Sequence, residues 1–412
     1  MVGGFRREDQ LGRAIAKGAV VGLLAATLLH AQIGPGPLVK PLRATDTLPN
    51  DPDDPAIWIN RLDPSKSLIF GTVKVAAPAG ALAVFDLHGR MRQLLTGPDR
   101  PNNVDVEYGL TLGGLPTDIV VLTERLGRRL RAYAVATDGT GVHDISGTSL
   151  NVLDGAAGDE GAPMGIGLYR RVRDGAIFAI VAPKAGPREN YLWQYRLADD
   201  GKGKIKMTFV RRFGNFSGVG EIEAVAVDDA LGYVYYADED AGIHKWHADP
   251  DAPGANRELA LFGTTGYKGD REGLGIYTRP DGTGFIVSAD QTPGDSVVHL
   301  YPREGDVGRP HDHAREIGVF RVGADSTDGL DVTSTSLGPE FGRGLLVAMN
   351  STSRNFLIVN WADLPAFVGQ RSVVGQTFRS AEIGKPKGLP YEWPRNRASA
   401  WYHSSSVSWA SR

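Results

Sequence analysis

The sequence predicts an all-β fold, a six-bladed β-propeller around a central channel, and three observations support this prediction. Glycine (53 residues) and proline (25 residues) are abundant and separate short apolar runs, which favours strands joined by turns. One pattern recurs six times: an apolar strand, a polar residue at its end, a variable loop and a second strand. A further short motif precedes each pair, at intervals of about 50 to 60 residues.

The repeats place two sets of side chains at equivalent positions. The first strands of the pairs end at Lys74, Arg125, Lys184, Glu239, Asp290 and Asn350. The preceding motifs begin at Asp54, Asn103, Met164, Glu223, Glu272 and Asp328. Equivalent positions of successive blades encircle the channel, so each set is expected to form a ring around one mouth. The segment 38–48 is expected to supply the outer strand that closes the ring, and Trp58 and Trp246 are expected between blades.

Composition and the N-terminus bound the class of protein. A formal charge of −3 and 42% hydrophobic residues indicate a globular core and exclude nucleic-acid binding as a main task. Basic residues between positions 6 and 17 precede an apolar run at 18–29, and Ala31 offers a cleavage point. This pattern predicts a signal peptide over 1–31, because the run falls short of the roughly 20 residues that span a bilayer.

The signal peptide predicts export, and the rest of the chain predicts its domains and excludes some chemistry. We expect a secreted or periplasmic monomer with no stable membrane insertion after cleavage, a propeller domain over 33–366 and a C-terminal tail over 367–412 without a readable motif. The chain has no cysteine, which excludes disulfides, thiolate metal sites and a thiol nucleophile. The nine histidines lack the HExxH spacing and are interpreted as loop residues, His311 and His313 among them.

The two rings differ in charge. Four of the six residues in the first ring are carboxylates, and more acids flank them: Asp51, Asp53, Asp105, Glu221, Asp270, Asp325 and Asp331. Crowded carboxylates repel one another unless cations lie among them, and hard oxygen ligands favour calcium. The second ring carries three cations and then two acids, which suits a ligand with several anionic oxygens such as phosphate. The alternative interpretation gives these residues no functional role. Single acids are often solvated, Lys74 can be a surface cation, and Asn102 and Asn103 can form a turn.

Several of these motifs resemble the β-propeller phytases, the alkaline, calcium-dependent 3-phytase family, in their order and spacing. The matching segments lie between about Asp51 and Trp361 and comprise DDPAIW (53–58), NNVD (102–105), the strand-end Arg125, VAPK (181–184), EAVAVDD (223–229), ADED (237–240), DREGLGIY (270–277) and TDGLDV (327–332). The resemblance implies a six-bladed propeller, dependence on several calcium ions and hydrolysis of phosphate from phytate. It also implies one subsite for cleavage and a neighbouring one for affinity.

The resemblance also implies roles for individual residues. Lys74, Arg125 and Lys184 would hold the scissile phosphate. The catalytic set would comprise Lys74, Arg125, Lys184, Glu223 and Glu272, with Asp328 also at the substrate. Calcium would be held by Glu223, Glu239, Asp270, Glu272 and Asp328, with Asp325 as an open possibility because the acidic loop before TDGLD is short. Asp54 and the backbone carbonyl of Val104 would form a separate, stabilising calcium site.

Two departures from the family pattern affect the expected activity. Met164 stands where the family usually has a tyrosine at the cleavage subsite, and Ala185 stands where a glutamate usually follows the subsite lysine. The expected reaction is metal-activated attack of water on a phosphomonoester, without a phospho-enzyme. Two alternatives remain: another calcium-dependent propeller hydrolase, such as a phosphodiesterase or lactonase, and a non-catalytic propeller that binds an anionic ligand.

Overall fold

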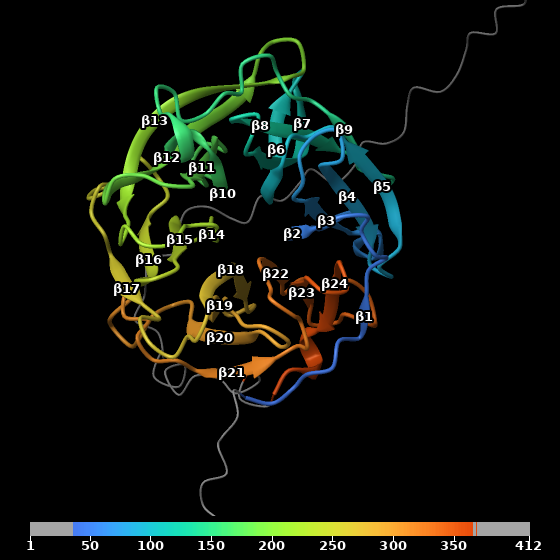
Figure 1. Ribbon diagram of the computed structural model, residues 1–412, viewed down its shortest axis with the longest axis vertical. Coiled ribbons are helices and arrows are strands. Elements are labelled where there is room, and N and C mark those ends of the chain that lie inside the picture. Colours follow the sequence, from blue (N-terminus) through green and yellow to red (C-terminus); the bar gives the residue numbers. More distant parts are fainter. Residues whose placement is uncertain (1–35, 366–367, 369–412) are drawn as a thin grey trace, which may run out of the picture. The chain divides into compact units, whose positions relative to one another are not determined.

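The strands form six four-stranded antiparallel sheets, which stand as blades around a central channel (Figure 1). The computed structural model describes residues 36–365 and 368. These residues form one compact unit. The prediction of an all-β, six-bladed propeller is therefore confirmed. The predicted signal peptide and almost all of the predicted tail lie outside the described residues.

Blade 1 comprises β2 (Pro52–Trp58), β3 (Leu68–Val73), β4 (Ala81–Asp86) and β5 (Met91–Thr96); blade 2 comprises β6 (Pro101–Leu112), β7 (Leu115–Glu124), β8 (Arg129–Val135) and β9 (Val142–Asp144). Blade 3 comprises β10 (Pro163–Arg170), β11 (Ile177–Pro183), β12 (Glu189–Asp199) and β13 (Ile205–Asn215); blade 4 comprises β14 (Val225–Asp228), β15 (Tyr233–Asp238), β16 (Gly242–His247) and β17 (Ala260–Phe262). Blade 5 comprises β18 (Asp270–Thr278), β19 (Gly284–Gln291), β20 (Val297–Pro302) and β21 (Gly318–Arg321); blade 6 comprises β22 (Leu330–Thr333), β23 (Leu345–Asn350), β24 (Asn355–Asn360) and β1 (Arg43–Ala44). Short 3₁₀ helices occupy Pro64–Lys66, Gly158–Gly161 and Trp361–Asp363.

The N-terminal segment closes the ring as predicted. Strand β1 pairs antiparallel with β24, with Arg43 opposite Ile358. The backbone amide of Thr45 donates to Phe356 O at 2.8 Å, which extends this pairing beyond the strand itself. The first described strand thus covers the edge of the last one, so blade 6 leaves no unpaired edge at β24.

The six predicted strand pairs and the motifs that precede them are also confirmed. The motifs become the innermost strands β2, β6, β10, β14, β18 and β22, which surround the channel in Figure 1. Trp58 packs with Phe70 of its own blade and Val120 of blade 2, and Trp246 is buried among residues of blades 3 and 4. Both tryptophans therefore lie between blades, as predicted.

Carboxylates along the channel fasten neighbouring blades. Asp105 of β6 accepts a hydrogen bond from the amide of Leu168 in β10 at 2.6 Å, and Asp331 of β22 accepts one from Ile57 in β2 at 2.8 Å. Burial raises the pKa of Asp105 to about 8 and that of Asp331 to about 6. These two flanking acids line a channel cavity of about 320 Å³ and bind backbone amides of the next blade.

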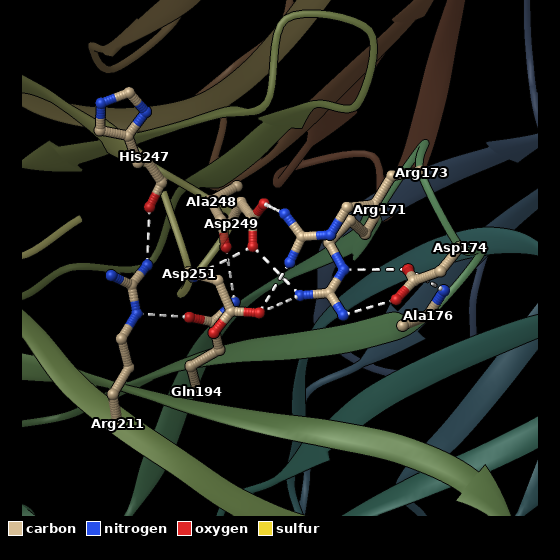
Figure 2. A network of polar contacts seen from close by, with 10 residues as sticks. All are labelled: Arg171, Arg173, Asp174, Ala176, Gln194, Arg211, His247, Ala248, Asp249 and Asp251. Atoms are coloured by element: carbon tan, nitrogen blue, oxygen red, sulfur yellow. Dashed lines mark hydrogen bonds and ion pairs between the residues drawn. The ribbon is translucent and has the colours of Figure 1, made fainter. Parts of the chain in front are cut away.

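A charged network joins blades 3 and 4 at the end of β10, at the other end of the channel from the predicted mouth. Figure 2 shows Arg171 and Arg173 from the turn after β10 facing Asp249 and Asp251 from the loop after β16. Arg171 donates to Asp251 at 2.7 Å and also to Asp174 on its own turn at 2.6 Å. Because Arg171 is mostly buried, this network fixes the seam better than a fully exposed ion pair would.

The interpretation of the histidines as loop residues is wrong for four of them, since His143 lies in β9, His244 and His247 lie in β16, and His299 lies in β20. The side chains of His244 and His299 are buried. His313 does lie in a loop, but it is buried too, where its Nδ1 contacts Pro302 O at 2.6 Å. The reason is packing: each ring stacks on or meets a tyrosine, such as Tyr236 beside His244 and Tyr267 beside His299.

A buried lysine gives a pH-dependent prediction for stability. Lys245 in β16 donates from Nζ to Pro310 O at 2.8 Å and lies 3.0 Å from His313 Nε2. Burial lowers the pKa of Lys245 to about 7, although Asp228 opposes the shift; nearby Arg303 adds to it. In the unfolded chain the lysine stays protonated to about pH 10, so folding becomes less favourable as pH falls from 10 to 7.

Replacing Lys245 with methionine removes this protonation penalty. At each pH we subtract the Tm of the wild type from the Tm of Lys245→Met. We expect this difference in Tm to be more positive at pH 6 than at pH 10 by at least about 5 °C. Thermal unfolding at both pH values provides the measurement, and the tyrosines that face the amine, Tyr233 and Tyr235, are unchanged by the substitution. An equal Tm difference at pH 6 and pH 10 would contradict the proposed titration.

Candidate functional site

The site lies at the mouth of the channel where the innermost strands begin and the second strands end. β-Bulges interrupt the pairing at this end of β2, β6, β10 and β18. A bulge places an extra residue in one strand and re-aims its side chain. In β2 the bulge falls at Asp53 and Asp54, and in β6 it falls at Asn102 and Asn103, so both strands present consecutive polar residues here.

Lys74 links two carboxylates at this mouth. Its Nζ lies 2.5 Å from Asp53 Oδ1 and 2.7 Å from Asp328 Oδ2. Burial alone would lower the pKa of Lys74, but the charges of Asp53, Asp328 and Glu223 outweigh it and raise the pKa. Lys74 is therefore a charged side chain held inside the acidic cluster, so the surface-cation interpretation is wrong.

Arg125 and Glu223 form the neighbouring pair. Arg125 Nη2 lies 3.6 Å from Glu223 Oε1, and Asn102 Nδ2 donates to Glu223 Oε2 at 3.3 Å. Burial, and then the nearby charge of Asp53, raise the pKa of Glu223 well above its usual range. Blades 2 and 4 thus meet at Glu223.

Glu272 and Glu239 extend the cluster toward blades 4 and 5. Glu272 is almost completely buried, and burial, followed by the charges of Glu223 and Glu239, raises its pKa well above the usual range. Glu239 accepts a hydrogen bond from the amide of Glu221 at 2.9 Å. Burial raises the pKa of Glu239 to about 7, and the charge of the exposed Asp270 adds to this shift. Burial likewise raises the pKa of Asp328 to about 7.

Oxygens without hydrogen bonds mark the cluster as a cation site. Asp53 Oδ2, the side-chain oxygens of Asn102 and Asn103, and Glu272 Oε2 are buried and accept no hydrogen bond, whereas Asp53 Oδ1 is paired with Lys74. Buried acceptors without a donor are costly, and a hard divalent cation would satisfy them. Within residues 36–365, no three acidic or histidine side chains form a ready-made metal cage. The donor chemistry fits calcium, although the ligands are not drawn together into a closed site.

Lys184 lies to one side of this cluster. Its Nζ is 3.2 Å from Glu221 Oε1 and 3.6 Å from Asp159 Oδ2. The next residue, Ala185, lines a separate cavity of about 250 Å³ together with Trp193 and Arg212. Where the family pattern has a glutamate, this chain therefore has a methyl group beside an open cavity.

Met164 is fully buried in β10 and presents its backbone to its neighbour. Thr123 Oγ1 donates to Met164 O at 2.6 Å, across the seam between blades 2 and 3. The side chain therefore offers neither a hydrogen bond nor exposed surface to a substrate at the mouth.

Asp54 and Asp325 form their hydrogen bonds outside the Lys74 cluster. Asp54 lines the channel and accepts a hydrogen bond from the Val104 amide at 3.0 Å, and burial raises its pKa well above the usual range. Asp325 accepts hydrogen bonds from Thr352 Oγ1 and the Gly294 amide, in the loops of blades 5 and 6.

In the predicted second ring, Asp290 is assigned one position too early. It is buried and accepts hydrogen bonds from the amides of Gly269 at 2.8 Å and Lys268 at 3.0 Å. The next residue, Gln291, reaches the site and donates to Asp328 Oδ1. The repeat itself contains the signal, because the run YAD-Glu239 of blade 4 corresponds to SAD-Gln291 of blade 5. Sequence reasoning also left Asp53 and Asn102 without roles.

Comparisons with known proteins show the family of this chain. A family model described as Phytase matches residues 29–379. The chain belongs to the phytase family. A curated 3-phytase of Bacillus subtilis (strain 168) is 29% identical over 337 residues, which cover 77% of this chain and 81% of the relative. The identification from the motifs as a β-propeller phytase is thereby confirmed.

Similar solved structures add no functional argument for this phytase-family chain. One is the calcium-binding protein regucalcin from Agrobacterium tumefaciens, with a TM-score of 0.46, 11% identity, and coverage of 79% of this chain and 97% of that one. Another is BBS1N in complex with ARL6DN, with a TM-score of 0.38, 12% identity, and coverage of 73% and 76%. Within the described residues, no helix has the length and apolarity needed to cross a membrane.

Proposed function

We propose that this member of the phytase family is a calcium-dependent phosphomonoester hydrolase that releases inorganic phosphate from phytate, myo-inositol hexakisphosphate. Membership of the family and the 3-phytase relative support the reaction. The observation that carries calcium dependence is the set of buried oxygens around Asp53 and Glu272 that accept no hydrogen bond. Those oxygens lie beside the cations Lys74 and Arg125, so one mouth offers both kinds of contact that a phosphate needs.

The acids of the cluster are the proposed calcium ligands. Glu223, Glu239 and Glu272, with Asp328 and Asp270 beside them, are the residues we assign to calcium at the mouth; Asp54 with Val104 is the proposed stabilising site. Bound there, calcium would lower the pKa of a coordinated water and neutralise phosphate charge. The role of Asp325 stays a prediction, and its contacts with Thr352 and Gly294 favour a structural role in the loop.

The cations of the chain orient the phosphate. Arg125 presents a planar guanidinium, which can donate two parallel hydrogen bonds to phosphate oxygens, and Lys74 and Lys184 supply point charges on either side. Each of these cations already lies against a carboxylate, so binding a phosphate exchanges one anionic partner for another. The buried Met164 gives no replacement for the family tyrosine, and we therefore propose that these three cations alone hold the scissile group.

The first test is removal of calcium. Phosphate release from phytate is expected to fall at least about tenfold when calcium is chelated, and to recover when calcium is added back. The Tm is expected to drop by roughly 5 °C on chelation when the control holds calcium about 100-fold above its Kd, because the metal neutralises the crowded acids. Calorimetry and an inorganic phosphate assay provide the two measurements.

Three other substrates serve as controls for this test. A simple phosphomonoester is expected to be hydrolysed much more slowly than phytate, and a lactone or phosphodiester not at all. Undiminished release of phosphate from phytate after chelation would refute calcium dependence. Binding of phytate without turnover would favour the non-catalytic alternative.

We further propose that the chain is exported by a signal peptide over 1–31. The charge pattern and the apolar run of this segment support the proposal. Sequencing the N-terminus of protein recovered outside the cytoplasm would test it, with a new terminus near residue 32 expected. A terminus that remains at Met1 would refute it.

A further inference from the structure

Three of the six blades end their second strand with a buried acid. These residues are Glu124 at the end of β7, Asp238 at the end of β15 and Asp290 near the end of β19. The residue after each acid lies at the candidate site: Arg125, Glu239 or Gln291. The buried acids themselves are turned away from the mouth and face the third strand of their own blade.

Each acid meets a basic side chain at one and the same register position. The base is opposite the residue two positions before the acid: Arg131 opposite Leu122, His244 opposite Tyr236 and His299 opposite Ser288. Arg131 Nε donates to Glu124 Oε2 at 2.6 Å. His244 Nε2 lies 3.8 Å from Asp238, and His299 Nε2 lies 3.9 Å from Asp290; both distances are those of an ion pair rather than a hydrogen bond. We call these three acid–base pairs the strand-end clamps.

A second acid holds each base from the outer strand. Arg131 Nη1 lies 3.7 Å from Asp144, at the end of β9. The Nδ1 atoms of His244 and His299 pair with Glu258 and Glu316, which precede β17 and β21. Each of the two imidazole rings therefore lies between two carboxylates, with Nδ1 toward the outer acid and Nε2 toward the clamp acid.

Acid and base occur together within the chain. Where the residue at the acid's position is Val73, Pro183 or Met349, the equivalent register position of the third strand holds Ala83, Trp193 or Ile358. None of these three side chains can form an ion pair with a carboxylate. The base thus accompanies the acid from blade to blade, which indicates a joint role.

The clamp acids hold the loop that arrives from the preceding blade. Glu124 Oε1 accepts from the Asp99 amide at 2.9 Å, and Asp238 Oδ2 accepts from the Ser217 amide at 2.6 Å. Asp290 accepts from the amides of Lys268 and Gly269, directly before Asp270. Each clamp therefore fixes both a strand-end residue of the mouth and the loop that leads into the innermost strand.

We propose that the bases of the strand-end clamps are positioning residues of the active site, with separate duties. The Arg131 clamp of blade 2 sets Arg125 for the phosphate, whereas the His244 and His299 clamps of blades 4 and 5 set Glu239, Asp270 and Gln291 for the metal. This assignment rests on the proposed function, because it takes Arg125 as a phosphate contact and the acids as calcium ligands.

Because the clamps have different proposed roles, each variant should weaken the affinity for one ligand only. A general loss of stability would not produce this pattern. We compare Arg131→Met and His299→Leu in the full chain, measuring calcium affinity by titration calorimetry and inorganic phosphate affinity at saturating calcium. His299→Leu is expected to weaken calcium about tenfold and phosphate less than twofold, since residues that orient metal ligands affect affinity to this extent. Arg131→Met is expected to weaken phosphate about tenfold and calcium less than twofold.

Conservative and control variants accompany these two. His299→Gln and Arg131→Lys keep a donor toward the clamp acid and should recover most of each lost affinity. Ile358→Val, at the same register position of blade 6, should change neither affinity. Equal losses of both affinities in both variants, or no loss in either, would overturn the proposal.

Hydrogen exchange separates failure of the clamps from failure of the proposed function. Exchange at the Gly269 amide should accelerate in His299→Leu alone, and exchange at the Asp99 amide should accelerate in Arg131→Met alone. If the wild-type protein binds no calcium, the proposed function fails, while selective exchange would still support the clamps. Unchanged exchange at both amides would overturn them.

Discussion

Substituting glutamine for Glu272 is expected to lower kcat for phytate about 100-fold or more while the protein stays folded. Glu272 is almost completely buried among Glu223, Glu239 and Asp328, and its Oε2 accepts no hydrogen bond. Glutamine keeps the volume of the side chain but removes one charge from the proposed calcium ligands. The same change relieves repulsion, so the Tm without calcium is expected to rise and the increase in Tm caused by calcium is expected to shrink.

A lower kcat together with a higher Tm in the absence of calcium distinguishes this prediction from simple damage to the fold. Glu189→Gln, at an exposed position at the start of β12, provides the matched control and should change neither kcat nor Tm appreciably. A Glu272→Gln enzyme with a rate within about twofold of wild type would remove Glu272 from the site. A lower Tm in the absence of calcium would contradict the proposed repulsion.

The fold was predictable because the chain repeats one local pattern. Each repeat pairs an apolar strand with a second strand, and neither can bury its apolar face alone, so six copies specify neighbouring blades. The closing strand was predictable for a related reason, since the segment 38–48 precedes the first repeat and the last blade lacks an outer strand of its own. Hydrophobic pattern decided both outcomes, without reference to any side-chain contact.

The contacts within the site were less predictable, because bulges and register decide them. A repeat alignment that ends blade 5 at Asp290 places a buried clamp acid in the ring, whereas Gln291 is the residue that reaches Asp328. A bulge lets Asp53 and Asp54 both leave the regular alternation of a strand, which the sequence does not reveal. The buried His244 and His299 had no motif to signal them, since the register of neighbouring strands decides which acids they face.

Arg125→Ala is expected to lower kcat/KM for phytate by about 100-fold or more, while calcium binding is retained or tightened. The guanidinium is the planar donor at the mouth and lies 3.6 Å from Glu223. Its removal takes a positive charge away from Glu223, so the acids attract a divalent cation more strongly. Kinetics with phytate and calcium titration of the same protein check the two halves of this expectation.

Arg125→Lys sharpens the test, because lysine restores the charge without the planar pair of donors. We expect this variant to recover calcium affinity to the wild-type value and to recover only part of kcat/KM. Arg92→Ala, on the exposed part of β5, should behave as wild type in both assays. If Arg125→Ala keeps its full kcat/KM, the guanidinium does not hold the phosphate. If Arg125→Ala loses both kcat/KM and calcium binding, Arg125 supports the fold of the mouth. The proposed division between cations for phosphate and acids for calcium then fails.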